Sequence, residues 1–173
     1  VTTIPFGIKA DGAQDIVDIA AETRNYEKIP ETYINWVNYN LERLEYKEYY
    51  KMLGAAGFRI QEEPKPYQAY LRDLAMCASV LSPKGNGIDC YRTLETLYMG
   101  SLPVVEMSQV SYDLRELPLL IVKSMYGLRS NELYDLYKRV KAMNKSMDKA
   151  KLSYWKDQFI YKRKEIFNIC AGF

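Results

Sequence analysis

The residues best suited to chemistry lie in a glycine-containing loop, Ser82-Pro-Lys-Gly-Asn-Gly-Ile-Asp89, between an apolar run and a helical pattern. Gly85 and Gly87 let the backbone turn sharply and approach a ligand with no Cβ in the way. The loop leads to a helix N-terminus, where free N–H groups and the helix dipole favour an anion such as a diphosphate. The sequence therefore predicts an anion site at this loop.

Two basic residues accompany the loop. Lys84 precedes the predicted helix and Arg92 lies in its first turn, where the helix dipole disfavours cations. A bound anion would offset this repulsion. The alternative interpretation is that both side chains extend into water, and the local pattern does not separate the two.

Glu95 follows Arg92 by three residues, so the two side chains share a neighbouring part of one helix face. Helical spacing predicts an apolar stripe that packs on the sheet and consists of Ile88, Tyr91, Leu94 and Leu97 or Tyr98. Glu95 would then face the cleft, where its carboxylate can accept hydrogen bonds from two ribose hydroxyls. An exposed glutamate paired with Arg92 is the alternative.

The elements around this loop alternate between strand and helix. Short apolar strands are predicted at 34–39, 58–60, 78–82, 102–106 and 119–122, and helices at 41–53, 67–76 and 89–99, the last ending at Gly100. A further strand is expected at 1–8, a short helix at 15–24, and two final helices at 131–143 and 145–167. This order indicates an α/β fold, a Rossmann-like doubly wound parallel sheet with helices on both faces and additional C-terminal helices. Ligands bind beyond the carboxyl ends of the strands in such sheets.

Composition excludes several classes of site. The chain has no histidine among its 173 residues, which rules out Ser-His-Asp and Cys-His catalysis in this chain. Its three cysteines have no CxxC spacing and predict reduced thiols without a zinc site. No apolar run approaches the roughly 20 residues of a membrane span, and no signal-peptide pattern is visible. Reduced cysteines favour the cytoplasm, whereas a Golgi lumen location would require an anchor outside this sequence.

The charge is unevenly distributed although the net charge is only +2. Residues 138–164 contain ten Lys or Arg and two Asp. A solvated helix face explains this excess, and a positive field that attracts an anionic substrate or a partner surface is the functional alternative. No nucleic-acid-binding motif accompanies the charge, so nucleic acid is not expected as a partner.

The run from Ser82 to Val105 resembles the C-terminal motif of exostosin-like GT-B glycosyltransferases. Members of that family typically read Ser/Cys-Pro-Arg-Gly-Asn-Gly-x-Asp-x-His-Arg-x-Trp-Glu-x-Leu-x-x-Gly-x-x-Pro-Ile-Val. The flanking segments 33–40, 67–74 and 117–122 are also similar, so the resemblance covers about residues 31–160. It implies a half of a GT-B fold that binds a nucleotide sugar, with Arg92 and Glu95 as contacts to the phosphates and to the nucleoside or sugar.

Three positions depart from the family pattern. Lys84 replaces arginine, which keeps the charge but loses the bidentate fork. Tyr91 stands where histidine is usual, and Leu94 where tryptophan is frequent. The site looks retained, with an altered donor preference as one consequence. The expected donor-binding residues are Asn40, Arg43, Ser82, Lys84, Gly85, Asn86, Gly87, Asp89, Arg92 and Glu95.

The resemblance also implies a reaction and its participants. The expected activity is metal-independent transfer of a sugar from a UDP- or GDP-sugar to a glycan or glycoprotein, without a cofactor. Arg92 would stabilise the leaving diphosphate, and the catalytic base would come from an N-terminal acceptor-binding domain of the same polypeptide. Residues 1–30 would be an interdomain segment or a remnant of that domain, and 31–173 the donor domain. A non-catalytic nucleotide-binding or scaffolding module is the alternative function.

Overall fold

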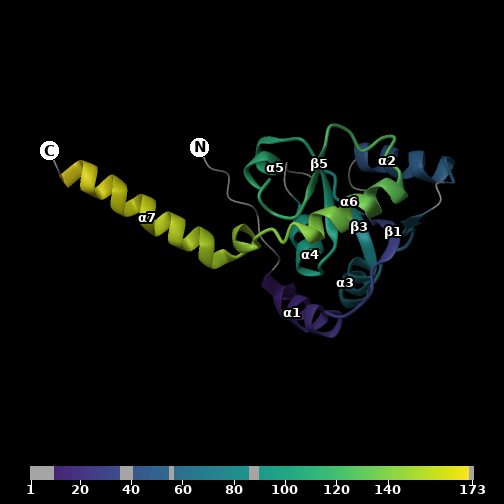
Figure 1. Ribbon diagram of the computed structural model, residues 1–173, viewed down its shortest axis with the longest axis horizontal. Helices are drawn as coiled ribbons and strands as arrows, with labels where there is room; N and C mark the ends of the chain where they lie inside the picture. Colours follow the sequence, from purple (N-terminus) through teal and green to yellow (C-terminus); the bar gives the residue numbers. More distant parts are fainter. Residues whose placement is uncertain (1–9, 36–40, 55–56, 86–89, 172–173) are drawn as a thin grey trace.

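The computed structural model describes residues 10–35, 41–54, 57–85 and 90–171, and the side chains from Asp11 to Tyr161 within them. The strand predicted at 1–8 lies outside this part of the chain. The described elements, shown in Figure 1, are η1 (Ala10–Gly12), α1 (Ala13–Glu22), β1 (Ile29–Ile34), α2 (Leu41–Met52), β2 (Phe58–Ile60), α3 (Tyr67–Met76), β3 (Cys77–Leu81), α4 (Tyr91–Tyr98), β4 (Leu102–Glu106), α5 (Gln109–Asp113), β5 (Leu120–Val122), α6 (Ser130–Ala142), η2 (Asp148–Ala150) and α7 (Leu152–Ala171).

The five strands form one parallel sheet in the order β2-β1-β3-β4-β5. The chain starts at β1, moves outward to β2, and then crosses back to β3 on the other side of β1. The connections therefore diverge between β1 and β3, which makes this the switch point where ligands bind in open parallel sheets. The α/β class and the Rossmann-like arrangement are confirmed.

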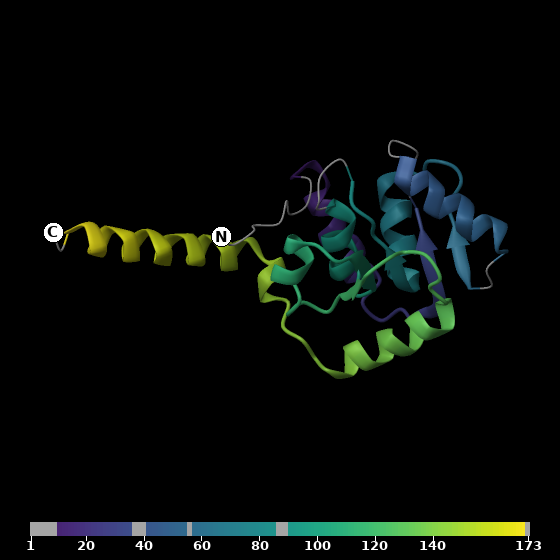
Figure 2. The same cartoon turned by 90° about the horizontal axis from the view of Figure 1, so that it is seen from above.

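Helices cover both faces of the sheet because the strands are apolar on both sides. Tyr33 and Val80 pack against α1 and α3 on one face. Ile34 and Leu81, the next residue along each strand, pack against α2 and α6 on the opposite face. Figure 2 shows α6 and α1 on opposite sides of the sheet, as a doubly wound fold requires.

Helix α1 is part of this core. Its Ile16 and Ile19 are buried in the same cluster as Tyr33 and Leu71, and α1 packs on α3. Lys28, in the segment after α1, donates hydrogen bonds to Ala75 O and Met99 O, the carbonyls at the ends of α3 and α4. The division of the chain at residue 30 stays a prediction, but residues 13–22 pack on α3 and α4 of the following part of the chain.

Most predicted elements occur within one or two residues of their expected bounds, and three differ. The first described strand is Ile29–Ile34, which ends where the strand predicted at 34–39 begins, and residues 36–39 of that prediction lie outside the described residues. Helix α5 was not predicted, and the last long helix begins at Leu152 after the short η2 turn and not at residue 145. Gly100 ends α4 with φ of +71°, as its predicted role as a C-terminal cap requires.

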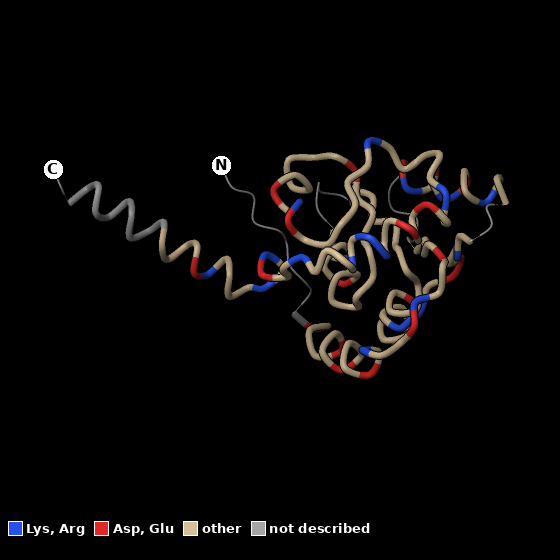
Figure 3. Tube along the Cα trace, in the orientation of Figure 1, with Lys and Arg blue, Asp and Glu red and all other residues tan. Residues whose placement is uncertain are grey.

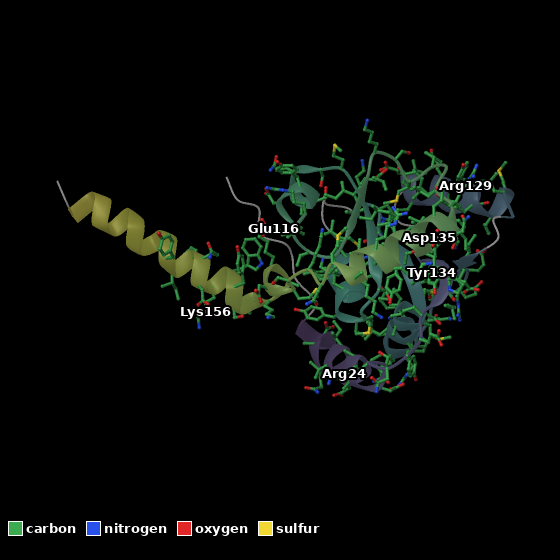
Figure 4. All side chains as sticks on the ribbon, viewed as in Figure 1. Arg24, Glu116, Arg129, Tyr134, Asp135 and Lys156 are labelled. Carbon is green, nitrogen blue, oxygen red and sulfur yellow. The ribbon has the colours of Figure 1, made fainter. Side chains whose placement is uncertain are left out.

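Two lysines of the basic C-terminal segment contact the turn that follows α5. Lys145 donates to Arg115 O and Leu117 O, and Lys149 donates to Asp113 O and forms an ion pair of 3.1 Å with Glu116, which is labelled in Figure 4. These lysines fix the turn after α5. Figure 3 shows basic and acidic residues interspersed over the body, and the choice between a solvated face and a positive field at residues 138–164 stays open.

Candidate functional site

The predicted site residues lie at the carboxyl edge of the sheet, beside the switch point. Ser82 follows β3, and its backbone N–H still donates to Val104 O in the sheet. Arg92 and Glu95 come from the first two turns of α4, and Arg43 from the start of α2. Arg43, Arg92 and Glu95 line one cavity of about 640 Å³, called here the Arg92 cavity. Of the other predicted residues, Asn40, Asn86, Gly87 and Asp89 lie outside the described residues.

Glu95 is part of the wall of the Arg92 cavity. Tyr67 OH donates a hydrogen bond to Glu95 Oε1 and Tyr70 OH donates one to Glu95 Oε2, and the donor–acceptor distance is 2.8 Å in both. Glu95 is only 5% exposed and lines the Arg92 cavity, so it is not the exposed glutamate of the alternative interpretation. Its carboxylate is buried and oriented by two phenols from α3.

The two tyrosines act as hydrogen-bond donors. Burial and the Glu95 carboxylate raise the pKa of Tyr67. Burial also raises the pKa of Tyr70 well above its usual value, although the charge of Arg92 opposes the shift. Both phenols therefore stay protonated near neutral pH and donate to Glu95.

Arg92 lies beside the same groups. Burial lowers the pKa of its guanidinium, but the neighbouring Tyr70, Cys90 and Glu95 raise it by more, so that the group stays charged. Arg92 Nη1 also lies 3.7 Å from Cys90 Sγ. A positive charge is thus held within the first turn of α4, adjacent to a carboxylate, where it can contact a phosphate.

Arg43 contacts the glycine-containing loop directly. Its Nε donates a hydrogen bond to Lys84 O at a distance of 2.8 Å, and its Nη2 donates one to Pro83 O at 3.2 Å. The same guanidinium lies 3.4 Å from Cys90 Sγ. Arg43 therefore joins the start of α2 to both ends of the loop, and its predicted contact with the donor stays a prediction.

Lys84 and Ser82 lie at a different cavity from Arg92. Both line a cavity of about 230 Å³, called here the Glu106 cavity, which adjoins the Arg92 cavity at Cys90. Lys84 forms an ion pair of 3.1 Å with Glu42, and Ser82 Oγ lies 3.0 Å from Thr93 Oγ1 of α4. The structure thus separates the predicted site into two neighbouring parts.

The predicted apolar stripe of α4 needs a correction. Tyr91 is 39% exposed and lines the Arg92 cavity, so it does not pack on the sheet. The buried positions are Thr93 to Leu97, because α4 packs against both β4 and the neighbouring helices α1 and α3. Ile88 lies outside the described residues.

Sequence reasoning missed several residues at the Arg92 cavity. Tyr67 and Tyr70 were predicted only as parts of a helix, and Cys90 and Asn35 were not singled out. Asn35 Nδ2 donates to Tyr33 OH, which in turn donates to the buried carboxylate of Asp73. The i, i+3 spacing of Tyr67 and Tyr70 was a visible signal, since it places two phenols on one helix face.

Comparison with known proteins identifies the family. Residues 40–169 match the family model described as RXYLT1 C-terminal domain, which covers about three quarters of the chain. The chain belongs to this family. Its members are associated with glycosyltransferases, so this RXYLT1-type domain is glycosyltransferase-related, in agreement with the exostosin-like resemblance at the coarse level. No curated protein matches the chain significantly.

Two classes of feature are absent from the described part of this RXYLT1-type domain. Across those residues, no group of three or more Cys, Asp or Glu side chains is arranged to hold a metal ion. Within the same residues, no helix combines the length and the apolar character needed to cross a bilayer.

Proposed function

We propose that this domain binds a nucleoside-diphosphate sugar, a UDP- or GDP-sugar, for transfer of the sugar to a glycan or glycoprotein acceptor. The observation that carries the proposal is the buried Glu95, oriented by Tyr67 and Tyr70 next to the charged Arg92 at the N-terminus of α4. A cation and a helix N-terminus suit a diphosphate, and an oriented carboxylate suits a ribose diol. The two groups are adjacent, as the two parts of a nucleotide are.

In the proposed reaction, an acceptor hydroxyl oxygen forms a bond to the anomeric carbon while the bond from that carbon to the phosphate oxygen breaks. The electron pair of the broken bond leaves with the nucleoside diphosphate, and the acceptor proton passes to a base in a separate acceptor-binding domain. Arg92 and the α4 N-terminus stabilise the negative charge that develops on the diphosphate. In this scheme the charge is neutralised without a divalent cation.

Thermal-shift screening against UDP-, GDP- and CMP-sugars tests the proposal, because a ligand that binds only the folded state raises the melting temperature. Alkylation of Cys90, followed by peptide mass spectrometry, tests the location. Cys90 lines the Arg92 cavity, whereas Cys77 is fully buried and serves as the internal control. We expect one nucleotide to raise the melting temperature and to slow alkylation of Cys90. Stabilisation without protection of Cys90 would contradict the proposed location.

A further inference from the structure

The Glu106 cavity contains Ser82 and Lys84 of the predicted site but neither Arg92 nor Glu95. It lies at the carboxyl ends of β3 and β4, where Ser82 follows one strand and Glu106 ends the other. Cys90, the residue before α4, lines both this cavity and the Arg92 cavity. A ligand with its diphosphate at the N-terminus of α4 can therefore extend one end into each cavity.

The two carboxylates of the Glu106 cavity are held in place. Tyr46 OH donates a hydrogen bond to Glu106 Oε1 at a distance of 2.6 Å, and it lies 3.3 Å from Glu42 Oε1. Tyr46 is buried, and burial together with Glu106 raises its pKa, so the phenol stays protonated. Glu42 also pairs with Lys84. Both acids line the cavity as oriented acceptors.

Size and polarity restrict the occupant. The cavity of about 230 Å³ is smaller than the roughly 300 Å³ at which pockets for drug-sized ligands begin, so it suits a single ring and not a nucleoside. Glu42 and Glu106 of the lining are hydrogen-bond acceptors, and Lys84 and Lys123 balance their charge, so the wall suits a neutral ligand with hydroxyl groups. Apolar side chains, including Val110 and Leu114, complete the wall. A neutral sugar ring has this combination of many hydroxyls and apolar C–H surface.

We infer that the Glu106 cavity holds the sugar ring of the donor, with Glu106 and Glu42 as acceptors for its hydroxyls. The inference rests on the proposed function, because it assigns the part of the donor that extends beyond the diphosphate. Glu106 is the residue through which the domain distinguishes a nucleotide sugar from the free nucleoside diphosphate.

The test compares two dissociation constants for each variant by calorimetry, one for the nucleoside diphosphate and one for its sugar. The probes are UDP with UDP-xylose and UDP-glucose, and GDP with GDP-mannose. We expect Glu106→Gln to weaken binding of the sugar nucleotide about tenfold, the loss of one charged hydrogen bond, and to change binding of the free diphosphate less than about twofold. Glu42→Gln, on the opposite side of Tyr46, is the second variant, and the exposed Glu116→Gln is the matched control.

The outcomes separate this inference from the proposed function. If the wild-type protein binds neither UDP nor GDP, the proposed function fails. A second outcome is that the wild-type protein binds one of them, but Glu106→Gln and Glu42→Gln change the dissociation constants of the free diphosphate and of the sugar nucleotide equally, or leave both unchanged. The sugar assignment is then overturned and the nucleotide site stands. An unchanged affinity for the sugar nucleotide would also exclude the donor sugar as the occupant, which leaves an acceptor sugar as the remaining source of hydroxyls.

Discussion

At the scale of single residues, Arg92 and Glu95 are expected to contact different parts of one ligand. Arg92 presents a positive charge beside the α4 N-terminus, and Glu95 presents a carboxylate fixed by two phenols. The spacing placed both residues on neighbouring parts of one helix face, and the exostosin-like resemblance implied that both are binding groups. The sequence could not show that Glu95 is buried, because its partners Tyr67 and Tyr70 lie on α3, 28 and 25 residues earlier in the chain.

Arg92→Ala should weaken binding of inorganic pyrophosphate and of the preferred nucleoside diphosphate to a similar extent. The lost contact is a charge-assisted hydrogen bond to phosphate worth about 1.5–3 kcal/mol, or roughly 10- to 150-fold in affinity. Calorimetric titration of both ligands measures the change. Arg72→Ala is the control, since Arg72 forms an exposed ion pair with Glu22. A loss confined to the nucleotide would show that Arg92 does not contact the diphosphate.

Glu95→Gln should weaken the nucleoside diphosphate by about tenfold and leave pyrophosphate unchanged, because the ribose hydroxyls lose a charged acceptor. Gln is chosen over Ala because Glu95→Ala would leave the two tyrosine hydroxyls without their buried acceptor, at about 1–3 kcal/mol each. The choice of Gln follows from the burial of Glu95. Equal affinities for the nucleotide in Glu95→Gln and wild type, with a lower melting temperature, would make the carboxylate purely structural.

At the scale of elements, the order of strands and helices was predictable because the strands are short apolar runs and the helices have clear periodicity. Strand β1 begins at Ile29, before the expected start at Ile34. It contains Pro30 and Glu31, which are residue types depleted in strands, and its register shifts between Ile29 and Thr32 where it pairs with β3. Helix α5 was missed because it has only five residues. It is stabilised by Ser108 and Ser111, which form a reciprocal capping box.

Lys28 illustrates an element-scale contact that no local pattern reveals. Its ammonium donates to Ala75 O, Met99 O and Ser101 Oγ, and so joins the ends of α3 and α4. Lys28→Met should lower the free energy of unfolding by about 1–3 kcal/mol at neutral pH, because the carbonyls lose their donor. Chemical denaturation measures the loss.

The pH dependence of this loss has a defined sign. Burial, and to a smaller extent the charge of Lys141, lower the pKa of Lys28 to about 8 in the folded state. The pKa of an unfolded lysine is near 10.4. Between these pH values the unfolded state binds more protons than the folded state, so the contribution of Lys28 to the free energy of unfolding rises with pH. The stability difference between wild type and Lys28→Met should therefore grow from pH 8 to about 10.5. A constant difference over this range would contradict the assignment.

At the scale of the whole molecule, the described fold contains one five-stranded parallel sheet and a helix that leaves it. Figures 1 and 2 show α7 extending away from the body, and Figure 4 shows Lys156 on this projecting part. Near the start of α7, Trp155 packs in the cluster that contains Leu94, whereas Phe159 and Tyr161 are exposed. The sequence predicted a long final helix but not its direction, because direction depends on contacts and not on periodicity.

The 173-residue chain is expected to bind the donor but to transfer sugar very slowly or not at all. Catalysis needs donor and acceptor held together, and the acceptor-binding groups and the base are proposed to lie in another domain. Product detection by mass spectrometry, with glycan acceptors and the preferred nucleotide sugar, measures the rate. Turnover at roughly 1 s⁻¹ or faster by this chain would refute the two-domain proposal.

The central claim is that Arg92, Glu95 and the N-terminus of α4 form a nucleoside-diphosphate site that works without a metal. Calorimetric titration of the wild-type chain with UDP and with GDP, each in EDTA and in excess Mg²⁺ or Mn²⁺, tests it most directly. We predict saturable binding of one nucleotide, with dissociation constants that agree within about twofold with and without the cation, well under the 1.4 kcal/mol of a tenfold change. Binding that occurs only with the cation, or no binding of either nucleotide, would contradict the account.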